Sequence, residues 1–185
     1  TVLLSLGRLA KEKNTTEIIK AMQQLPDAVL LIVGDGPERA ALEQQAQTLH
    51  VADRVIFAGA VPPAEVPRCY ALGDVFVSAS TSEAQGLTYI EAMAAGLPLL
   101  CRADPCLDAL AREGETGWAY HTPAELSARA AALPQGAQLA AMRQSARRAV
   151  QPYTKEQFGL SVAQLYAAAL GRKHAARSVA RENVA

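Results

Sequence analysis

Short apolar runs alternate with longer helical stretches along the first 120 residues of the chain. Each run is apolar at consecutive positions, which is typical of strands that are buried on both faces of a sheet. The stretches between the runs repeat their apolar residues at helical spacing. Strands are expected at residues 2–6, 29–33, 55–58, 75–78 and 98–101, with a weaker one at 118–120, and helices at 15–24, 37–49, 64–72, 87–95 and 107–112.

This alternation predicts the fold class. Parallel strands need long crossover connections, and helices in those connections cover both faces of the sheet. We therefore expect a doubly wound α/β fold, with a six-stranded, mostly parallel, Rossmann-like sheet. The loops that follow the strands should then lie along one edge, where such folds bind their ligands.

Beyond residue 120 the pattern changes to Ala-rich helical segments, expected at 123–133, 138–150 and 155–170. We place one domain at residues 1–170 and a basic tail at 171–185. The tail could be a membrane-surface helix, a partner helix or a solvated terminus. Its basic residues are Arg172, Lys173, Arg177 and Arg181. Because the chain starts on what reads as a core strand, we expect it to be a piece of a longer protein.

Composition narrows the function classes. The 18 basic and 18 acidic residues cancel, which argues against the broad positive field of a general nucleic-acid binder. Cys69, Cys101 and Cys106 form neither an even disulfide set nor a CxxC pair, so a reduced, cytoplasmic setting is expected, with Cys101 in the core. No apolar run approaches the roughly 20 residues that span a bilayer.

Candidate anion ligands follow the first strand. Gly7 permits a turn, and Arg8 and Lys13 come next. An Arg fork and a compact Lys charge suit a diphosphate that gains negative charge as it leaves. Two solvated loop cations are the alternative. The "GDGP" at 34–37 after the second strand lacks the third glycine of a dinucleotide fingerprint, and a tight strand-to-helix turn explains it equally well.

Most of the candidate ligand-binding groups lie in the stretch "TSEAQGLTYIEAMAAGLPLL", residues 81–100. Gly86 lacks a side chain, so an anion could reach the helix-start amides of Gln85, Gly86, Leu87 and Thr88. Glu91 lies on the same helix face as those amides and suits a ribose diol. Glu83 precedes the helix and is placed for sugar hydroxyls or for positive charge at an anomeric carbon. A capping acid and a surface helix acid are the alternative interpretations of the two glutamates.

These residues resemble a known family. The Glu, seven residues, Glu spacing from Glu83 to Glu91 is similar to the donor half of retaining GT-B glycosyltransferases of family 4, also called group 1. The resemblance covers residues 1–170 through five ordered motifs, "SLGRLAKEKN", "LLIVGDGPE", "VIFAGAV", "SEAQGLTYIEAMAAGLPLL" and "EGETGWAY". It implies that Arg8 and Lys13 hold the donor diphosphate and that Val61 presents its backbone to the base. It further implies that Glu91 binds the ribose and Glu83 the donor sugar.

The resemblance also implies an activity, which is hexosyl transfer from a nucleotide-diphosphate sugar. Many relatives carry an aromatic residue where this chain has Gln85, and this variant resembles the diacylglycerol glucosyltransferase branch, which favours a UDP-hexose donor and a lipid or glycan acceptor. The family needs no metal and no further cofactor, and this chain has no DxD motif.

The amino-terminal acceptor domain of the family lies outside the resemblance, so this chain alone should be inactive. The full-length protein would be cytoplasmic, with possible peripheral contact at the inner face of the membrane. Two alternatives remain open: a sugar-nucleotide binding module without turnover, and a nucleotide-sugar 2-epimerase.

Overall fold

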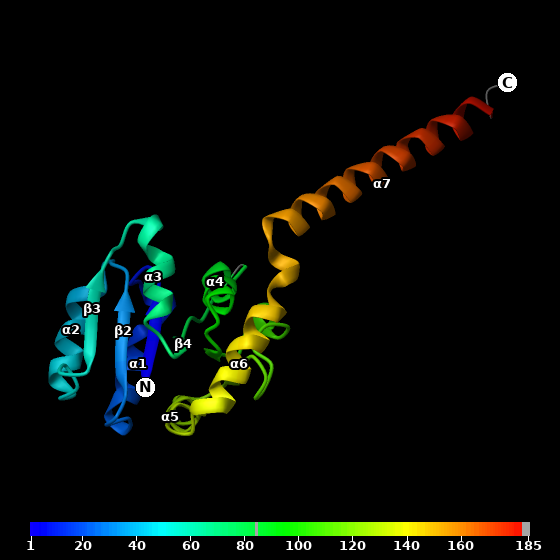
Figure 1. Cartoon of the computed structure of the whole chain (residues 1–185). Coiled ribbons are helices and arrows are strands. Elements are labelled where there is room, and N and C mark those ends of the chain that lie inside the picture. Colours follow the sequence, from blue (N-terminus) through cyan, green and yellow to red (C-terminus); the bar gives the residue numbers. More distant parts are fainter. Residues whose placement is uncertain (84, 183–185) are drawn as a thin grey trace. The chain divides into compact units, whose positions relative to one another are not determined.

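The computed structural model describes residues 1–83 and 85–182, with side chains up to residue 170. Its core is one six-stranded sheet in the order β3-β2-β1-β4-β5-β6, and every strand pairing is parallel (Figure 1). The predicted doubly wound fold is therefore confirmed. The strands are β1 (Val2–Leu6), β2 (Val29–Val33), β3 (Val55–Gly59), β4 (Val75–Ser78), β5 (Leu99–Arg102) and β6 (Gly117–Tyr120).

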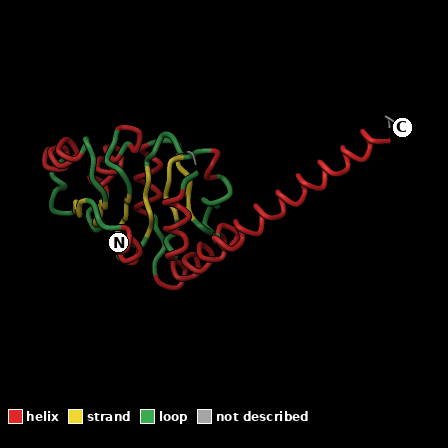
Figure 2. The backbone as a smooth tube through the Cα atoms, turned by 90° about the horizontal axis from the view of Figure 1, so that it is seen from above, coloured by secondary structure: helices red, strands yellow, loops and turns green. Residues whose placement is uncertain are grey.

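Helices cover both faces of this sheet (Figure 2). One face packs beneath α1 (Thr15–Ala21), α2 (Arg39–Thr48) and α5 (Pro123–Ala131), which contribute Ile18, Leu42 and Leu126 to one core cluster. The other face packs beneath α3 (Val66–Ala71), α4 (Leu87–Ala95) and α6 (Gly136–Ala149), which contribute Tyr70, Met93 and Ala146 to a second cluster. Short 3₁₀ turns complete the order: η1 (Lys11–Lys13), η2 (Met22–Gln24), η3 (Pro63–Glu65), η4 (Pro105–Leu107) and η5 (Gln151–Tyr153).

One predicted helix is wrong. The segment 107–112 contains only the end of the 3₁₀ turn η4, followed by hydrogen-bonded turns. Leu107 and Leu110 are both buried, and their three-residue spacing fits a 3₁₀ turn as well as an α-helix. The amide of Arg112 then donates to the Thr116 hydroxyl at 2.9 Å, which turns the chain toward β6.

The chain divides into two compact units, Thr1–Val150 and Gln151–Ala185. The first unit thus ends before the domain boundary expected at residue 170. The second contains α7 (Lys155–Glu182), on which Phe158, Leu165 and Tyr166 are exposed. The basic side chains predicted to form a tail at 171–185 lie outside the described side chains. In the described part of the chain, no helix combines the length and the apolar character needed to cross a membrane.

Candidate functional site

A cavity of about 160 Å³ opens at the carboxyl edge of the central strands. The loop after β1 and the segment before α4 meet here, because β1 and β4 are neighbours in the sheet. Several contacts join them. Lys13 Nζ lies 2.7 Å from Glu83 Oε1, and the Glu12 carbonyl accepts hydrogen bonds from the Thr81 amide at 2.9 Å and from the hydroxyls of Thr81 and Ser80. The cavity is lined by Ser5, Leu6, Gly7, Arg8, Leu9, Lys13, Thr15, Ser78, Glu83 and Thr88.

The three charged groups of this cavity differ in their partners. Glu83 is only 10% exposed and is paired with Lys13, which is 31% exposed. Arg8 is exposed and makes no side-chain hydrogen bond or ion pair with any residue that the structure describes. The Lys13 ammonium partly neutralises the Glu83 carboxylate, while the Arg8 guanidinium keeps its donors available for an anion.

The loop that carries Arg8 rests on the "GDGP" turn. The Gly7 amide donates to the Val33 carbonyl and the Leu9 amide donates to the Asp35 carbonyl, both at 2.9 Å. Gly34 has φ +137°, and a Cβ there would lie 1.9 Å from the Gly7 carbonyl oxygen. Gly34 therefore lets these two backbone segments approach each other, and this close contact explains the turn without a bound dinucleotide.

The start of α4 forms the other wall. Gly86 is its N-cap residue, with φ +61° and no side-chain cap, so the first helix amides remain available as donors. A Cβ at Gly86 would lie 3.0 Å from Leu107 Cδ2 and 3.2 Å from Tyr89 Cδ2. The left-handed backbone favours glycine here, and a Cβ would also press against these two side chains. Gln85 and Leu87 are exposed, and the anion role of these amides stays a prediction.

Glu91 lies one helical turn further along α4 and lines a different hollow. This hollow is more apolar, has a volume of about 550 Å³ and is formed by α3, α4 and Pro63 at the start of η3. The Tyr70 hydroxyl donates to Glu91 Oε2 at 2.9 Å. Val61 is half-buried in the loop between β3 and η3 and lines neither hollow. The structure therefore groups Gly7, Arg8, Lys13, Glu83 and Thr88 in one cavity. The other predicted site residues do not line it: Val61, Gln85, Gly86, Leu87 and Glu91.

Comparison with known proteins decides the family. Residues 1–133 match the family described as "Glycosyl transferases group 1". The chain belongs to this family. Its sheet and flanking helices are those of GT-B glycosyltransferases, as the predicted fold required. The matches assign no role to single residues, so the roles of Arg8, Lys13, Glu83 and Glu91 in this glycosyltransferase domain stay predictions.

Individual relatives add detail. The chain is 33% identical over 170 residues to the alpha-monoglucosyldiacylglycerol synthase of Acholeplasma laidlawii, covering 89% of this chain and 43% of the relative. It is 41% identical over 129 residues to the enzyme of the same name from Streptococcus pneumoniae, covering 68% of this chain and 29% of the relative. The glycosyltransferase domain thus spans less than half the length of these two relatives.

Solved structures agree with this assignment. The pneumococcal O-GlcNAc transferase GtfA, in complex with UDP and GlcNAc, has a TM-score of 0.76 at 26% identity, with coverage of 89% of this chain and 36% of that one. Sucrose-phosphate synthase from Thermosynechococcus elongatus has a TM-score of 0.82 at 29% identity, with coverage of 92% and 46%.

Two tyrosines of the glycosyltransferase domain contact the predicted site glutamates, although no sequence motif singles them out. The Tyr89 hydroxyl lies 2.8 Å from Ser78 Oγ and 3.4 Å from Glu83 Oε1, and Tyr70 holds Glu91. Burial raises the pKa of both phenols, so both stay protonated. Tyr89 follows Gly86 by three residues and could have been suspected from helical spacing. Tyr70 is 21 residues from Glu91, and no local pattern links them.

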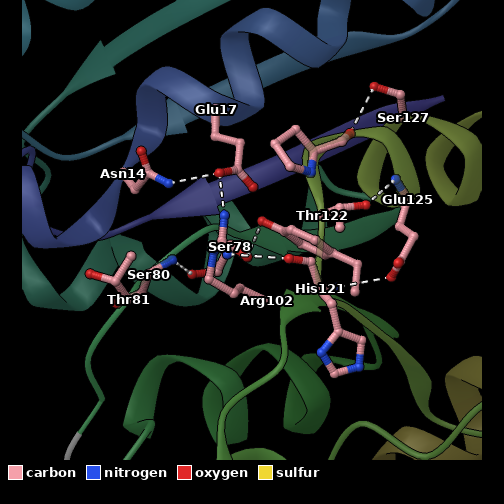
Figure 3. Close-up of polar contacts among 12 residues, drawn as sticks. Asn14, Glu17, Ser78, Ser80, Thr81, Arg102, His121, Thr122, Glu125 and Ser127 are labelled. Atoms are coloured by element: carbon pink, nitrogen blue, oxygen red, sulfur yellow. Dashed lines mark hydrogen bonds and ion pairs between the residues drawn. The ribbon is translucent and has the colours of Figure 1, made fainter.

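A second polar cluster supports the loop that carries Lys13 (Figure 3). The Glu17 carboxylate is buried, accepts a hydrogen bond from Asn14 Nδ2 at 2.9 Å and forms an ion pair with Arg102 at the end of β5. The Arg102 guanidinium also lies 5.6 Å from the centre of the Tyr120 ring. The cluster ties the start of α1, directly after Lys13, to the edge of the sheet. From the sequence alone, Glu17 cannot be told from an ordinary acidic residue in the first turn of a helix.

Proposed function

We propose that this chain is the donor-binding domain of a retaining glycosyltransferase of family 4, which moves a hexose from a UDP-hexose to a lipid or glycan acceptor. The observation that carries the proposal is the cavity in which Arg8, Lys13, Glu83 and Thr88 meet at the start of α4. Two cations line this cavity beside Thr88 at the start of α4, and a departing diphosphate needs positive charge of this kind.

Each residue has a distinct role in this proposal. Arg8 forks onto the diphosphate oxygens, and Lys13 bridges the diphosphate and Glu83. The amides from Gln85 to Thr88 add partial positive charge, so the donor binds without a metal ion. Because Lys13 already neutralises part of its charge, Glu83 can lie close to the anion and orient the sugar hydroxyls.

The nucleoside is held by the remaining residues. The Glu91 carboxylate accepts hydrogen bonds from the ribose hydroxyls, and the backbone near Val61 reads the edge of the base. UDP is the proposed nucleotide because a related structure was solved with UDP and GlcNAc. A lipid acceptor is preferred because two relatives are named alpha-monoglucosyldiacylglycerol synthases. An acceptor of that class would place the full-length protein in the cytoplasm, peripherally at the membrane.

A thermal-shift panel tests the donor class. UDP-, GDP- and ADP-sugars are each added to the chain in EDTA. A ligand at 100 times its dissociation constant stabilises the fold by about 2.7 kcal/mol, so the proposed UDP-sugar should raise the melting temperature clearly and the others should raise it less. No shift with any nucleotide sugar would contradict the proposed function.

Replacement of Glu91 by alanine should weaken nucleotide-diphosphate binding by roughly 1.5–3 kcal/mol, the scale of losing hydrogen bonds to a charged group. That is about a 10- to 150-fold higher dissociation constant, which calorimetric titration with UDP measures. Glu115→Ala is the matched control, because this acid lies in the turns before β6 and pairs only with Arg112 among the described residues. Equal UDP affinity of Glu91→Ala and the parent chain would show that Glu91 is a surface acid.

A further inference from the structure

Each of the two signature glutamates is contacted by the hydroxyl of a buried tyrosine. Tyr70 of α3 is 2% exposed, and its hydroxyl lies 2.9 Å from Glu91 Oε2 and 3.3 Å from the Thr88 carbonyl oxygen. Tyr89 of α4 is 1% exposed, and its hydroxyl lies 3.4 Å from Glu83 Oε1 and 2.8 Å from Ser78 Oγ. Each ring is buried in the core, and its hydroxyl contacts one of the two glutamates.

Phe76 links the two tyrosines. Its ring centre is 6.2 Å from that of Tyr70, with the planes tilted by 51°, and 5.4 Å from that of Tyr89, in an edge-to-face arrangement at 73°. Phe76 belongs to β4 and is paired with Leu4 on one side and Leu99 on the other. Such close-packed aromatic rings have little room to change rotamer. The two rings, and with them their hydroxyls, are therefore held in fixed positions against strand β4.

The hydroxyls constrain the carboxylates chemically as well as sterically. A phenol has one proton, and burial raises the pKa of both, so each stays protonated and able to donate. An ionised carboxylate can only accept. Glu91 therefore has Oε2 engaged by Tyr70, which leaves Oε1 to face a ligand. Glu83 Oε1 lies 2.7 Å from Lys13 Nζ and 3.4 Å from the Tyr89 hydroxyl, whose one proton is free for Glu83 when the Ser78 hydroxyl donates to Tyr89. Oε2 of Glu83 is then left for a ligand.

We infer that Tyr70 and Tyr89 are positioning residues with separate duties: Tyr70 aims Glu91 at the ribose of the donor, and Tyr89 aims Glu83 at its sugar. The inference rests on the proposed function, because it takes the ligand of Glu91 to be a ribose and that of Glu83 to be a hexose. A purely structural role in the core would affect all ligands of the site alike.

Affinity ratios separate these two roles. Dissociation constants of 2′-deoxy-UDP, UDP and UDP-glucose are measured for the parent chain, Tyr70→Phe and Tyr89→Phe. Tyr70→Phe should reduce the preference for UDP over 2′-deoxy-UDP by about 2- to 10-fold, the effect of one hydrogen bond, and leave the preference for UDP-glucose over UDP unchanged. Tyr89→Phe should reduce the preference for UDP-glucose over UDP by a similar factor and leave the preference for UDP over 2′-deoxy-UDP unchanged.

Tyr120→Phe is the matched control. This tyrosine is fully buried, and its hydroxyl lies 3.3 Å from the Ser78 carbonyl oxygen and contacts neither signature glutamate. Both ratios should stay at the parent values. Glu91→Asp and Glu83→Asp identify which ratio each glutamate controls without changing the core, because each keeps the charge but withdraws the carboxylate from its tyrosine and from its proposed ligand. Glu91→Asp should lower the same ratio as Tyr70→Phe, and Glu83→Asp should lower the same ratio as Tyr89→Phe.

The outcomes test the positioning role of the tyrosines and the proposed function separately. If the parent chain prefers UDP to 2′-deoxy-UDP and UDP-glucose to UDP, but the tyrosine variants weaken all three ligands by one common factor, the positioning role is overturned and the proposed function stands. Unchanged ratios in the aspartate variants would overturn the proposed ligand roles of the two glutamates together with the positioning role. A parent chain that does not discriminate between UDP and 2′-deoxy-UDP would overturn the ribose role of Glu91 and the Tyr70 inference together.

Discussion

The 185-residue chain is expected to bind UDP-glucose in EDTA and to transfer almost no glucose to any acceptor. Binding should persist because every proposed donor contact, from Arg8 to Glu91, lies in this chain. Transfer should fail because an acceptor must be held against the anomeric carbon, and such positioning can be worth roughly 7–11 kcal/mol of the barrier. An open donor site also leaves the sugar hydrated, which weakens the electrostatic contacts that favour the transition state.

Calorimetry for binding and a radiolabelled glucose assay with diacylglycerol vesicles measure the two quantities. The full-length protein from which such a domain would come is the positive control, since the relatives are more than twice as long as the aligned part. Donor binding that disappears in EDTA would contradict the metal-free site. Robust transfer by the 185-residue chain would place the acceptor site within it.

Replacement of Gly34 by alanine is expected to destabilise the fold by about 2–6 kcal/mol, the sum of an unfavourable backbone conformation and a forced overlap. The new Cβ would lie 1.9 Å from the Gly7 carbonyl oxygen, so one of the two loops must move. Because the Gly7 loop carries Arg8, UDP affinity should fall as well. Urea unfolding measures the free energy of unfolding, and titration measures the affinity.

Gly7→Ala is the matched control for this prediction. Gly7 has a similar φ of +152°, but a Cβ there would have no neighbour within 4 Å. Its cost should therefore be only the backbone part, about 1–3 kcal/mol. Equal losses of stability in the two variants would show that the contact between the loops contributes nothing.

The sequence by itself determined the sheet and the place of the ligand loops. The runs at 2–6, 29–33 and 75–78 match β1, β2 and β4 residue for residue, because apolar runs between turn residues have few other stable environments. Parallel order then brings the carboxyl ends of neighbouring strands together. For this reason the meeting of the Lys13 loop with the Glu83 segment was predictable although 70 residues separate them.

The partners of the site residues were decided only by the tertiary structure. Glu17 pairs with Arg102 across 85 residues and Glu91 with Tyr70 across 21, and neither spacing has a local signature. A hydrogen bond needs its two atoms within about 3.5 Å, whereas sequence patterns locate residues only to a face or an edge. The strand order and the packing of α3 against α4 supply the missing precision, and with them the two tyrosines that hold the glutamates.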